Sequence, residues 1–173
     1  MIVTPTLYQF FHRHIQHGFK RAGLGEPETV AYVSDLLTRF ARTDALYPLH
    51  DHDQRPLTTL VQFLAEQRAA QDEDRAREMV IVRHLAEYAL FMSGFFRERL
   101  RSRGQLSYYA DHGRSAFGQT ADLETNSGRA RVYWRLQQDF ARVAEAVDDI
   151  RRHRLPLPPE TCGERPLAAL WRR

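Results

Sequence analysis

The sequence lacks the residues and runs that several common classes of protein need. It holds one cysteine, Cys162, in 173 residues, so no disulfide can form within the chain and no multi-thiolate metal site is available. No apolar run reaches the roughly 20 residues of a membrane-spanning helix, and the first residues do not have the pattern of an export signal. We therefore expect a cytoplasmic protein that does not bind a membrane.

Lysine is nearly absent as well, although arginine is abundant. Lys20 is the only lysine among 25 basic residues, and 22 acidic residues bring the formal net charge to only +3. A charge balance of this kind does not by itself indicate a phosphate backbone as ligand. The composition argues against nucleic acid as a partner.

Motifs for nucleophilic, nucleotide and di-iron chemistry are missing too. The stretch 113–117 lacks the closing glycine of a nucleophile elbow, and no Gly-x-x-x-x-Gly-Lys phosphate loop occurs. No acidic residue is followed three positions later by histidine, the spacing that carboxylate-bridged di-iron bundles use. With no complete catalytic constellation, we predict no catalytic residue and no bound cofactor.

Apolar residues at helical spacing are what the sequence has in quantity. The hydrophobic content of 43% is enough for one sizeable core. Residues 79–100 are apolar on more than one side, which only a helix surrounded by other helices needs. The pattern predicts an all-α, single-domain bundle over residues 1–154, with about six helices around a buried central helix at about 72–102.

The remaining helices are predicted from the same three-four spacing and from helix-start signals. They are expected at 5–22, 27–42, 57–64, 106–123 and, as one unbroken seam after the turn at 126–128, up to residue 150. The polar segment 43–56 is predicted as a loop.

Residues 155–173 change character and are rich in proline. We predict an extended tail strapped across its own bundle, because a free tail would leave Trp171 in water. The alternative is that this tail docks on another chain.

A histidine and a carboxylate share one side of the predicted central helix. At 100° per residue, His84, Glu87 and Gly94 fall within roughly 80° of arc, and a glycine there costs roughly 1 kcal/mol of helix propensity. Two interpretations stay open. The strip is a pocket for a haem, a divalent metal or a flat metabolite, or it is the least buried side of the helix, with Gly94 allowing close packing against a crossing helix.

The helix predicted at 106–123 supplies further candidates for ligand binding. They combine hydroxyl groups, an imidazole and a small residue, and they are Tyr109, His112, Gly113 and Ser115. Because the two helices are expected to be neighbours, these residues could face His84 and Glu87.

Four histidines have the spacing of incomplete metal sites. His14 and His17 lie three apart on the first predicted helix, and His50 and His52 alternate with aspartates in the predicted loop. Each pair supplies half a site, so a solvated role is the expectation for all four.

Two segments, Arg83 to Leu100 and Tyr108 to Phe117, resemble a group of uncharacterised small all-helical bacterial proteins. The resemblance rests on a His and acidic residue before an aromatic-Leu-Phe run and Gly-Phe, and on an aromatic-x-x-x-Gly-basic-Ser-aromatic pattern. This chain departs from it with Arg97 in place of proline and Phe117 in place of tyrosine. The resemblance implies a cytoplasmic helical protein and no particular activity.

The leading hypothesis for function is a non-enzymatic helical module that binds a protein partner or forms a homodimer, because the chain has surplus apolar surface and no catalytic set. The alternative is a helical enzyme or sensor that holds a haem or metal near His84 and Glu87.

Overall fold

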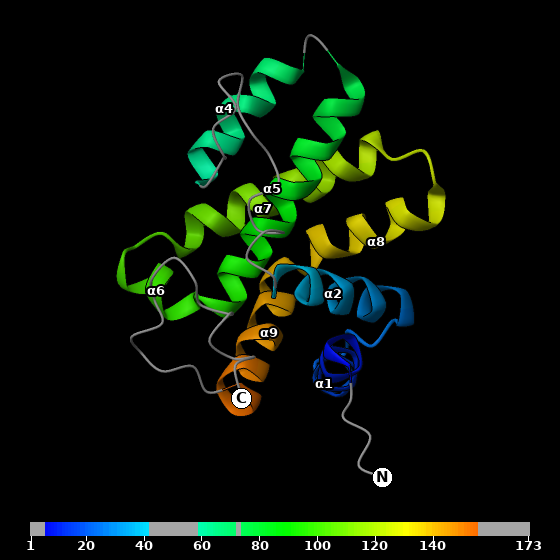
Figure 1. Ribbon diagram of the computed structural model, residues 1–173, viewed down its shortest axis with the longest axis vertical. Coiled ribbons are helices and arrows are strands. Elements are labelled where there is room, and N and C mark those ends of the chain that lie inside the picture. The colour runs from blue at the N-terminus through cyan, green and yellow to red at the C-terminus, as the bar shows by residue number, and fades with distance from the viewer. Residues whose placement is uncertain (1–5, 42–58, 72–73, 156–173) are drawn as a thin grey trace.

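The computed structural model describes residues 6–41, 59–71 and 74–155, and every regular element in these ranges is an α-helix (Figure 1). The predicted all-α class is confirmed. The described helices are α1 (Leu7–Arg21), α2 (Pro27–Phe40), α4 (Leu60–Ala70), α5 (Arg75–Phe95), α6 (Arg97–Ser102), α7 (Leu106–Leu123), α8 (Ser127–Gln138) and α9 (Phe140–Arg154).

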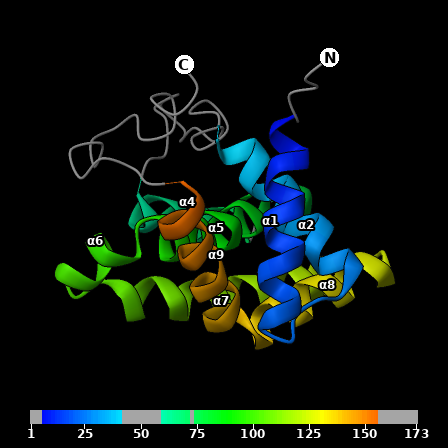
Figure 2. The same ribbon diagram turned by 90° about the horizontal axis from the view of Figure 1, so that it is seen from below.

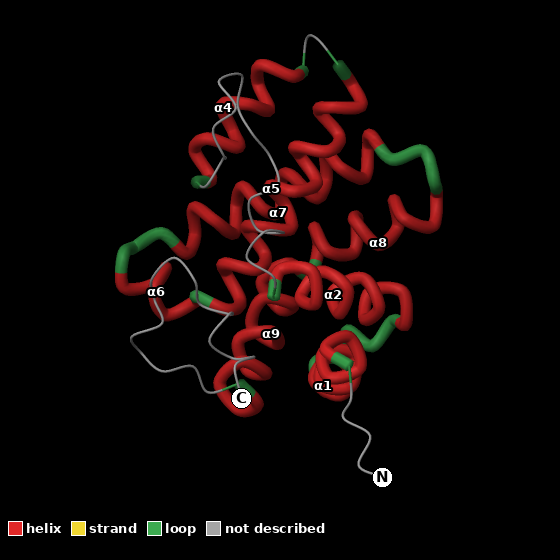
Figure 3. The backbone as a smooth tube through the Cα atoms, viewed as in Figure 1, coloured by secondary structure: helices red, strands yellow, loops and turns green. Residues whose placement is uncertain are grey.

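Helix α5 is the buried central helix that the sequence predicts. It packs against α7, α9, α4 and α2, so it is covered on several sides (Figure 3). From Ile81 to Leu90, only Arg83 is exposed to solvent. Among the described helices, none is both long enough and apolar enough to cross a lipid bilayer.

The central helix is shorter than predicted, because the chain breaks helical geometry at Phe96. The backbone there adopts φ −115° and ψ 26°, so α5 ends at Phe95 and α6 begins at Arg97. Phe95 stacks on the Phe91 ring at 4.8 Å, and Phe96 reaches the same ring edge-on at 5.9 Å. The break coincides with this ring packing, which helical spacing does not reveal.

The seam predicted as one helix up to residue 150 is also two helices. Asp139, at φ −100° and ψ 15°, separates α8 from α9. Its carboxylate accepts a hydrogen bond from Arg142 at 2.7 Å. Helix α8 packs mainly on α7, whereas α9 packs on α5 and α1, so each half of the seam has its own neighbours. These two breaks give eight described helices where about six were predicted.

Reciprocal capping fixes two helix starts. Thr6 accepts a hydrogen bond from the Gln9 backbone and Gln9 bonds back to Thr6, and Thr59 forms the same capping box at α4. Helix α4 begins later than the predicted 57–64, at Leu60, and continues beyond it to Ala70. The predicted loop 43–56 and the tail beyond Leu155 lie outside the described residues.

Two glycines let the helices approach closely at the centre. A Cβ atom at Gly94 would lie 2.5 Å from Val147 Cγ1 on α9, and one at Gly113 would lie 2.5 Å from Phe140 Cε2 and 2.9 Å from Ala89 Cβ. Gly94 therefore has the packing role against a crossing helix that one of the two interpretations gave it.

We predict that Gly94→Ala lowers the free energy of unfolding by about 1–3 kcal/mol, because overpacking outweighs the gain in helix propensity. Urea denaturation measures the change. The control is the double variant with Val147→Ala, which removes the Cγ1 methyl carbon that lies 2.5 Å from the new one. The double variant should lose less free energy of unfolding than the two single variants lose in sum. Strictly additive losses would contradict the proposed clash.

Candidate functional site

A buried carboxylate joins α5 to α2. Glu87 is 3% exposed, and its two oxygens accept hydrogen bonds from the Arg39 guanidinium at 2.9 and 3.1 Å. The Tyr32 hydroxyl donates a further hydrogen bond to Glu87. A paired and doubly hydrogen-bonded carboxylate of this kind satisfies the requirement for burying a charge. Glu87 therefore forms an ionic link between helices, contrary to the interpretation that it lies on the least buried side of the helix.

The electrostatics of this link keep its donors protonated. Burial, followed by the negative charge of Glu87, raises the pKa of the Tyr32 hydroxyl well above its ordinary value of 10.0. Burial lowers the pKa of the Arg39 guanidinium, but its hydrogen bond and attraction to Glu87 outweigh that effect and raise it overall. Both groups therefore act as fixed hydrogen-bond donors at neutral pH.

His84 lies one turn before Glu87 and is 6% exposed. Its ring packs against Phe40 of α2 at 5.5 Å and Phe63 of α4 at 5.1 Å between centroids, and it also stacks near Tyr88. The histidine is thus part of an aromatic cluster that connects three helices. His84 therefore does not lie on the least buried side of the helix either.

The candidates on α7 point in different directions. Tyr109 meets Tyr88 of α5 at 6.4 Å, and Gly113 lies in the close contact with Phe140. His112 packs edge-on against exposed Tyr108 at 4.4 Å. Ser115 is exposed and accepts a hydrogen bond from Gln119, which in turn accepts one from Gln67 of α4. These contacts run to different neighbours, and Glu87 makes its hydrogen bonds to α2.

The histidine pairs do not gain further ligands in the described part of the chain. No cluster of three or more His, Cys, Asp and Glu side chains is arranged there to hold a metal ion. His14 packs edge-on against Phe10 at 4.5 Å, while His17 is exposed. His50 and His52 lie outside the described residues.

Sequence reasoning missed the partners of Glu87. Tyr32 and Arg39 are seven residues apart and therefore lie on the same face of α2. A glutamate inside an otherwise apolar helix requires a cation or several hydrogen-bond donors. That requirement is the signal in the sequence from which a partner on a neighbouring helix could have been expected. Asp148 is a second buried carboxylate with cationic partners, since it is fully buried beside Arg151 and Arg152 of its own helix.

A groove lies between α2 and α8, next to this buried link. Its volume is about 450 Å³, and apolar atoms of Ala31, Tyr32, Val132 and Tyr133 line it. The rings of Tyr32 and Tyr133 meet edge-on at 5.5 Å. Tyr32 thus touches the groove with its ring and the buried carboxylate with its hydroxyl.

Charged side chains form the two lips of the groove. Glu28 and Asp35 lie on the α2 side, and Arg129 lies on the α8 side. Arg129 pairs with Glu124 at 3.1 Å and Asp35 pairs with Arg39 at 2.8 Å. Glu28 is exposed and has no ion pair within the described part of the chain. The groove therefore offers an apolar floor and, among the described residues, one carboxylate without an ion pair.

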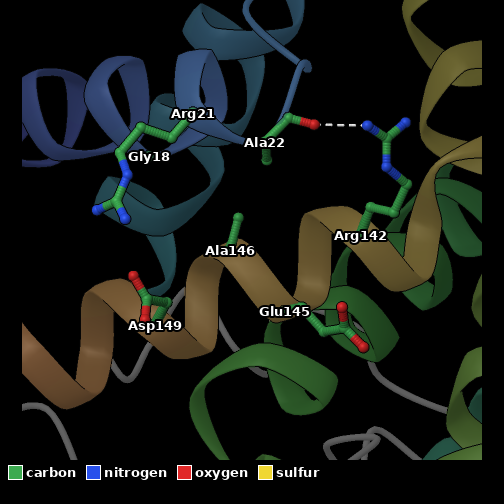
Figure 4. Close-up of a pocket in the computed structure, with 7 residues that line it drawn as sticks. All are labelled: Gly18, Arg21, Ala22, Arg142, Glu145, Ala146 and Asp149. Carbon is green, nitrogen blue, oxygen red and sulfur yellow. Dashed lines mark hydrogen bonds between the residues drawn. The ribbon is translucent and has the colours of Figure 1, made fainter.

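A second cavity, of about 370 Å³, lies between α1 and α9. Figure 4 shows Arg142 extending from α9 toward the Ala22 carbonyl at the end of α1, with Glu145 and Asp149 on the α9 side. Arg142 is committed to Ala22 and Asp139, and Glu145 pairs with Arg97 at 3.1 Å. This cavity is a charged helix junction: Arg21, Arg142, Glu145 and Asp149 line it together with three small residues, and it has no apolar floor.

Comparisons with protein-family models, curated proteins and solved structures find no match for this chain. The described part of the chain is an all-helical domain in which Tyr32 connects a buried ionic link to an apolar groove. Any function has to be argued from these features.

We predict that Arg39→Met lowers the free energy of unfolding by about 1–3 kcal/mol, because it leaves the buried Glu87 carboxylate without two of its hydrogen bonds. Asp35→Asn is the matched control and should change stability by less than about 1 kcal/mol, since that ion pair is exposed. The double variant Arg39→Met/Glu87→Met should recover most of the loss. A double variant as unstable as the sum would contradict the ionic link.

We predict that the free energy of unfolding falls at alkaline pH because the Tyr32 hydroxyl ionises less readily in the folded state. A raised pKa means that the folded state keeps the proton at a pH where the unfolded state has lost it. The stabilisation is therefore complete below pH 10 and declines as pH rises above it, by up to about 1.4 kcal/mol per pH unit. Denaturation at pH 9 to 11 measures this slope, which should be shallower in Tyr32→Phe. An equal change in the Tyr108→Phe control would rule out the assignment.

Proposed function

We propose that the protein is a non-enzymatic helical module that binds a segment of a partner protein in the groove between α2 and α8. The observation that carries this proposal is the apolar floor formed by Tyr32, Tyr133, Ala31 and Val132. A volume of about 450 Å³ lies within the roughly 300–1,000 Å³ range of binding pockets and accommodates a bulky side chain. Buried aromatic contacts of this kind are where protein interfaces concentrate their binding energy.

The lips of the groove indicate what the partner segment carries. Because Glu28 is exposed without an ion pair in the described part of the chain, a basic side chain beside the apolar anchor gains a new partner there. On the opposite lip, Arg129 already pairs with Glu124. We therefore expect a segment with an aromatic or long aliphatic residue next to a lysine or arginine.

A second copy of the chain is the other possible occupant, and its test is the oligomeric state. Equilibrium sedimentation of the native chain measures it. A dimer that is lost in the groove variants described below would identify self-association as the function of this surface. A monomer at high concentration leaves a different protein as the occupant.

The alternative of a haem or divalent metal at His84 and Glu87 is supported only by the aromatic surroundings of His84. A metal at Glu87 has to displace Arg39 from both carboxylate oxygens and Tyr32 from one of them. Elemental analysis and a visible spectrum of protein purified without added ligand test it. Stoichiometric metal or a visible chromophore would favour this alternative.

Arginine in the groove should abolish partner binding. We predict that Ala31→Arg and Val132→Arg each remove the same proteins from a quantitative pull-down in a lysate of the source organism, because a charged chain occupies the apolar floor. The matched controls Ala65→Arg and Ala69→Arg place the same charge on exposed positions of α4 and should keep those proteins.

A photo-crosslinking residue at position 31 provides the second measurement, with position 65 as its control. The captured protein should crosslink at 31 and not at 65. Equal capture by the groove and control variants, with folding verified by thermal denaturation, would contradict the groove as the binding site.

A further inference from the structure

Helix α1 carries cations and no anions. It is the 15-residue helix LYQFFHRHIQHGFKR, without a single aspartate or glutamate. At 100° per residue, four exposed residues fall within roughly 100° of arc, and we call them the cationic stripe: Arg13, His17, Lys20 and Arg21. Figure 2 shows α1 with α9 on one side and α2 on the other, so its remaining side faces outward.

The permanent charges of the stripe have no salt-bridge partner among the described residues. Within the part of the chain that the structure describes, no salt bridge reaches Arg13, Lys20 or Arg21. Two of the arginines of α8 differ in this respect, because Arg129 pairs with Glu124 and Arg135 pairs with Glu26. An uncompensated row of like charges attracts an anionic partner over about one Debye length, roughly 10 Å at 0.1 M salt.

A histidine beside the stripe lies close to a cation of α9 as well as to one of α1. His14 lies beside the stripe, and burial, followed by the positive charges of Arg154 and Arg13, lowers its pKa. Arg154, at the end of α9, therefore adds to the positive charge on this side of the molecule. The stripe and Arg154 come from helices far apart in the sequence.

From this charge arrangement we infer that the cationic stripe of α1 binds an acidic segment of a partner protein. The stripe covers about 12 Å, at 1.5 Å per residue from Arg13 to Arg21. Arg13, His17 and Arg21 are spaced four residues apart, about 6 Å. Carboxylates repeated at the same interval on a partner helix match this spacing, as in the charged flanks of paired helices.

The ends of the stripe favour a short acidic segment over a nucleic-acid strand. Glu145 and Asp149 line the cavity next to Arg21 (Figure 4). A strand with a phosphate at every nucleotide would continue past the stripe toward these carboxylates, whereas an acidic peptide can end before them. The inferred surface is separate from the groove between α2 and α8, because α2 lies between α1 and α8 (Figure 1).

The test is fluorescence anisotropy of the full chain with a labelled deca-glutamate peptide in 20 mM salt. The stripe variant Arg13→Gln/Lys20→Gln/Arg21→Gln should bind about tenfold more weakly, since three exposed charge pairs are lost. The matched control Arg68→Gln/Arg75→Gln/Arg103→Gln removes three exposed arginines that likewise have no described salt bridge, and it should bind within twofold of the native chain. Binding should weaken steadily up to 0.5 M salt.

Three results would overturn the inference. The native chain fails to bind the peptide in 20 mM salt, the stripe and control variants lose affinity equally, or a single-stranded DNA of ten nucleotides binds the stripe more tightly than the peptide does. Thermal denaturation of each variant verifies folding. The groove variants Ala31→Arg and Val132→Arg should bind the peptide like the native chain, so this test and that of the proposed function fail independently.

Discussion

The close contact of α5 with α7 and α9 is the constraint on which the rest of the structure depends. Gly113 brings α7 against both Ala89 of α5 and Phe140 of α9, and Gly94 brings α5 against Val147. With no Cβ at either glycine, three helices share one core layer, and packed interiors tolerate little change in volume. Helices α2, α4 and α8 then cover the surface that this layer leaves open.

The buried ionic link sets the position of α2 within that arrangement. Apolar packing alone permits sliding of one helix along another, but Glu87 accepts hydrogen bonds only where Arg39 and Tyr32 meet it. Replacing such pairs by apolar residues is often neutral for stability. The hydrogen bonds of Glu87 are directional, so they favour one register of α2 on α5. That register also fixes where the Tyr32 ring enters the groove beside Tyr133.

Helical spacing predicted the class, the central helix and most helix positions, because burial of an apolar face is a local property of the sequence. It did not predict the breaks at Phe96 and Asp139, where the apolar pattern continues while the packing partner changes. The candidate site was predicted only in part. Glu87 and His84 stood out as polar residues in an apolar helix, but their environment depends on α2 and α4, whose placement is a tertiary property.

The two surfaces proposed for binding differ in their physical basis, and this difference bears on how they would act together. The groove between α2 and α8 offers apolar area, whose contribution depends little on salt, whereas the stripe on α1 acts through charge at longer range. Charge complementarity mainly raises association rates, and buried apolar anchors mainly slow dissociation. Because α2 separates the two surfaces, one partner that spans α2 can use the stripe for encounter and the groove for retention. The ionic link at Glu87 joins α2 to α5, so the helix that separates the two surfaces is itself attached to the central helix.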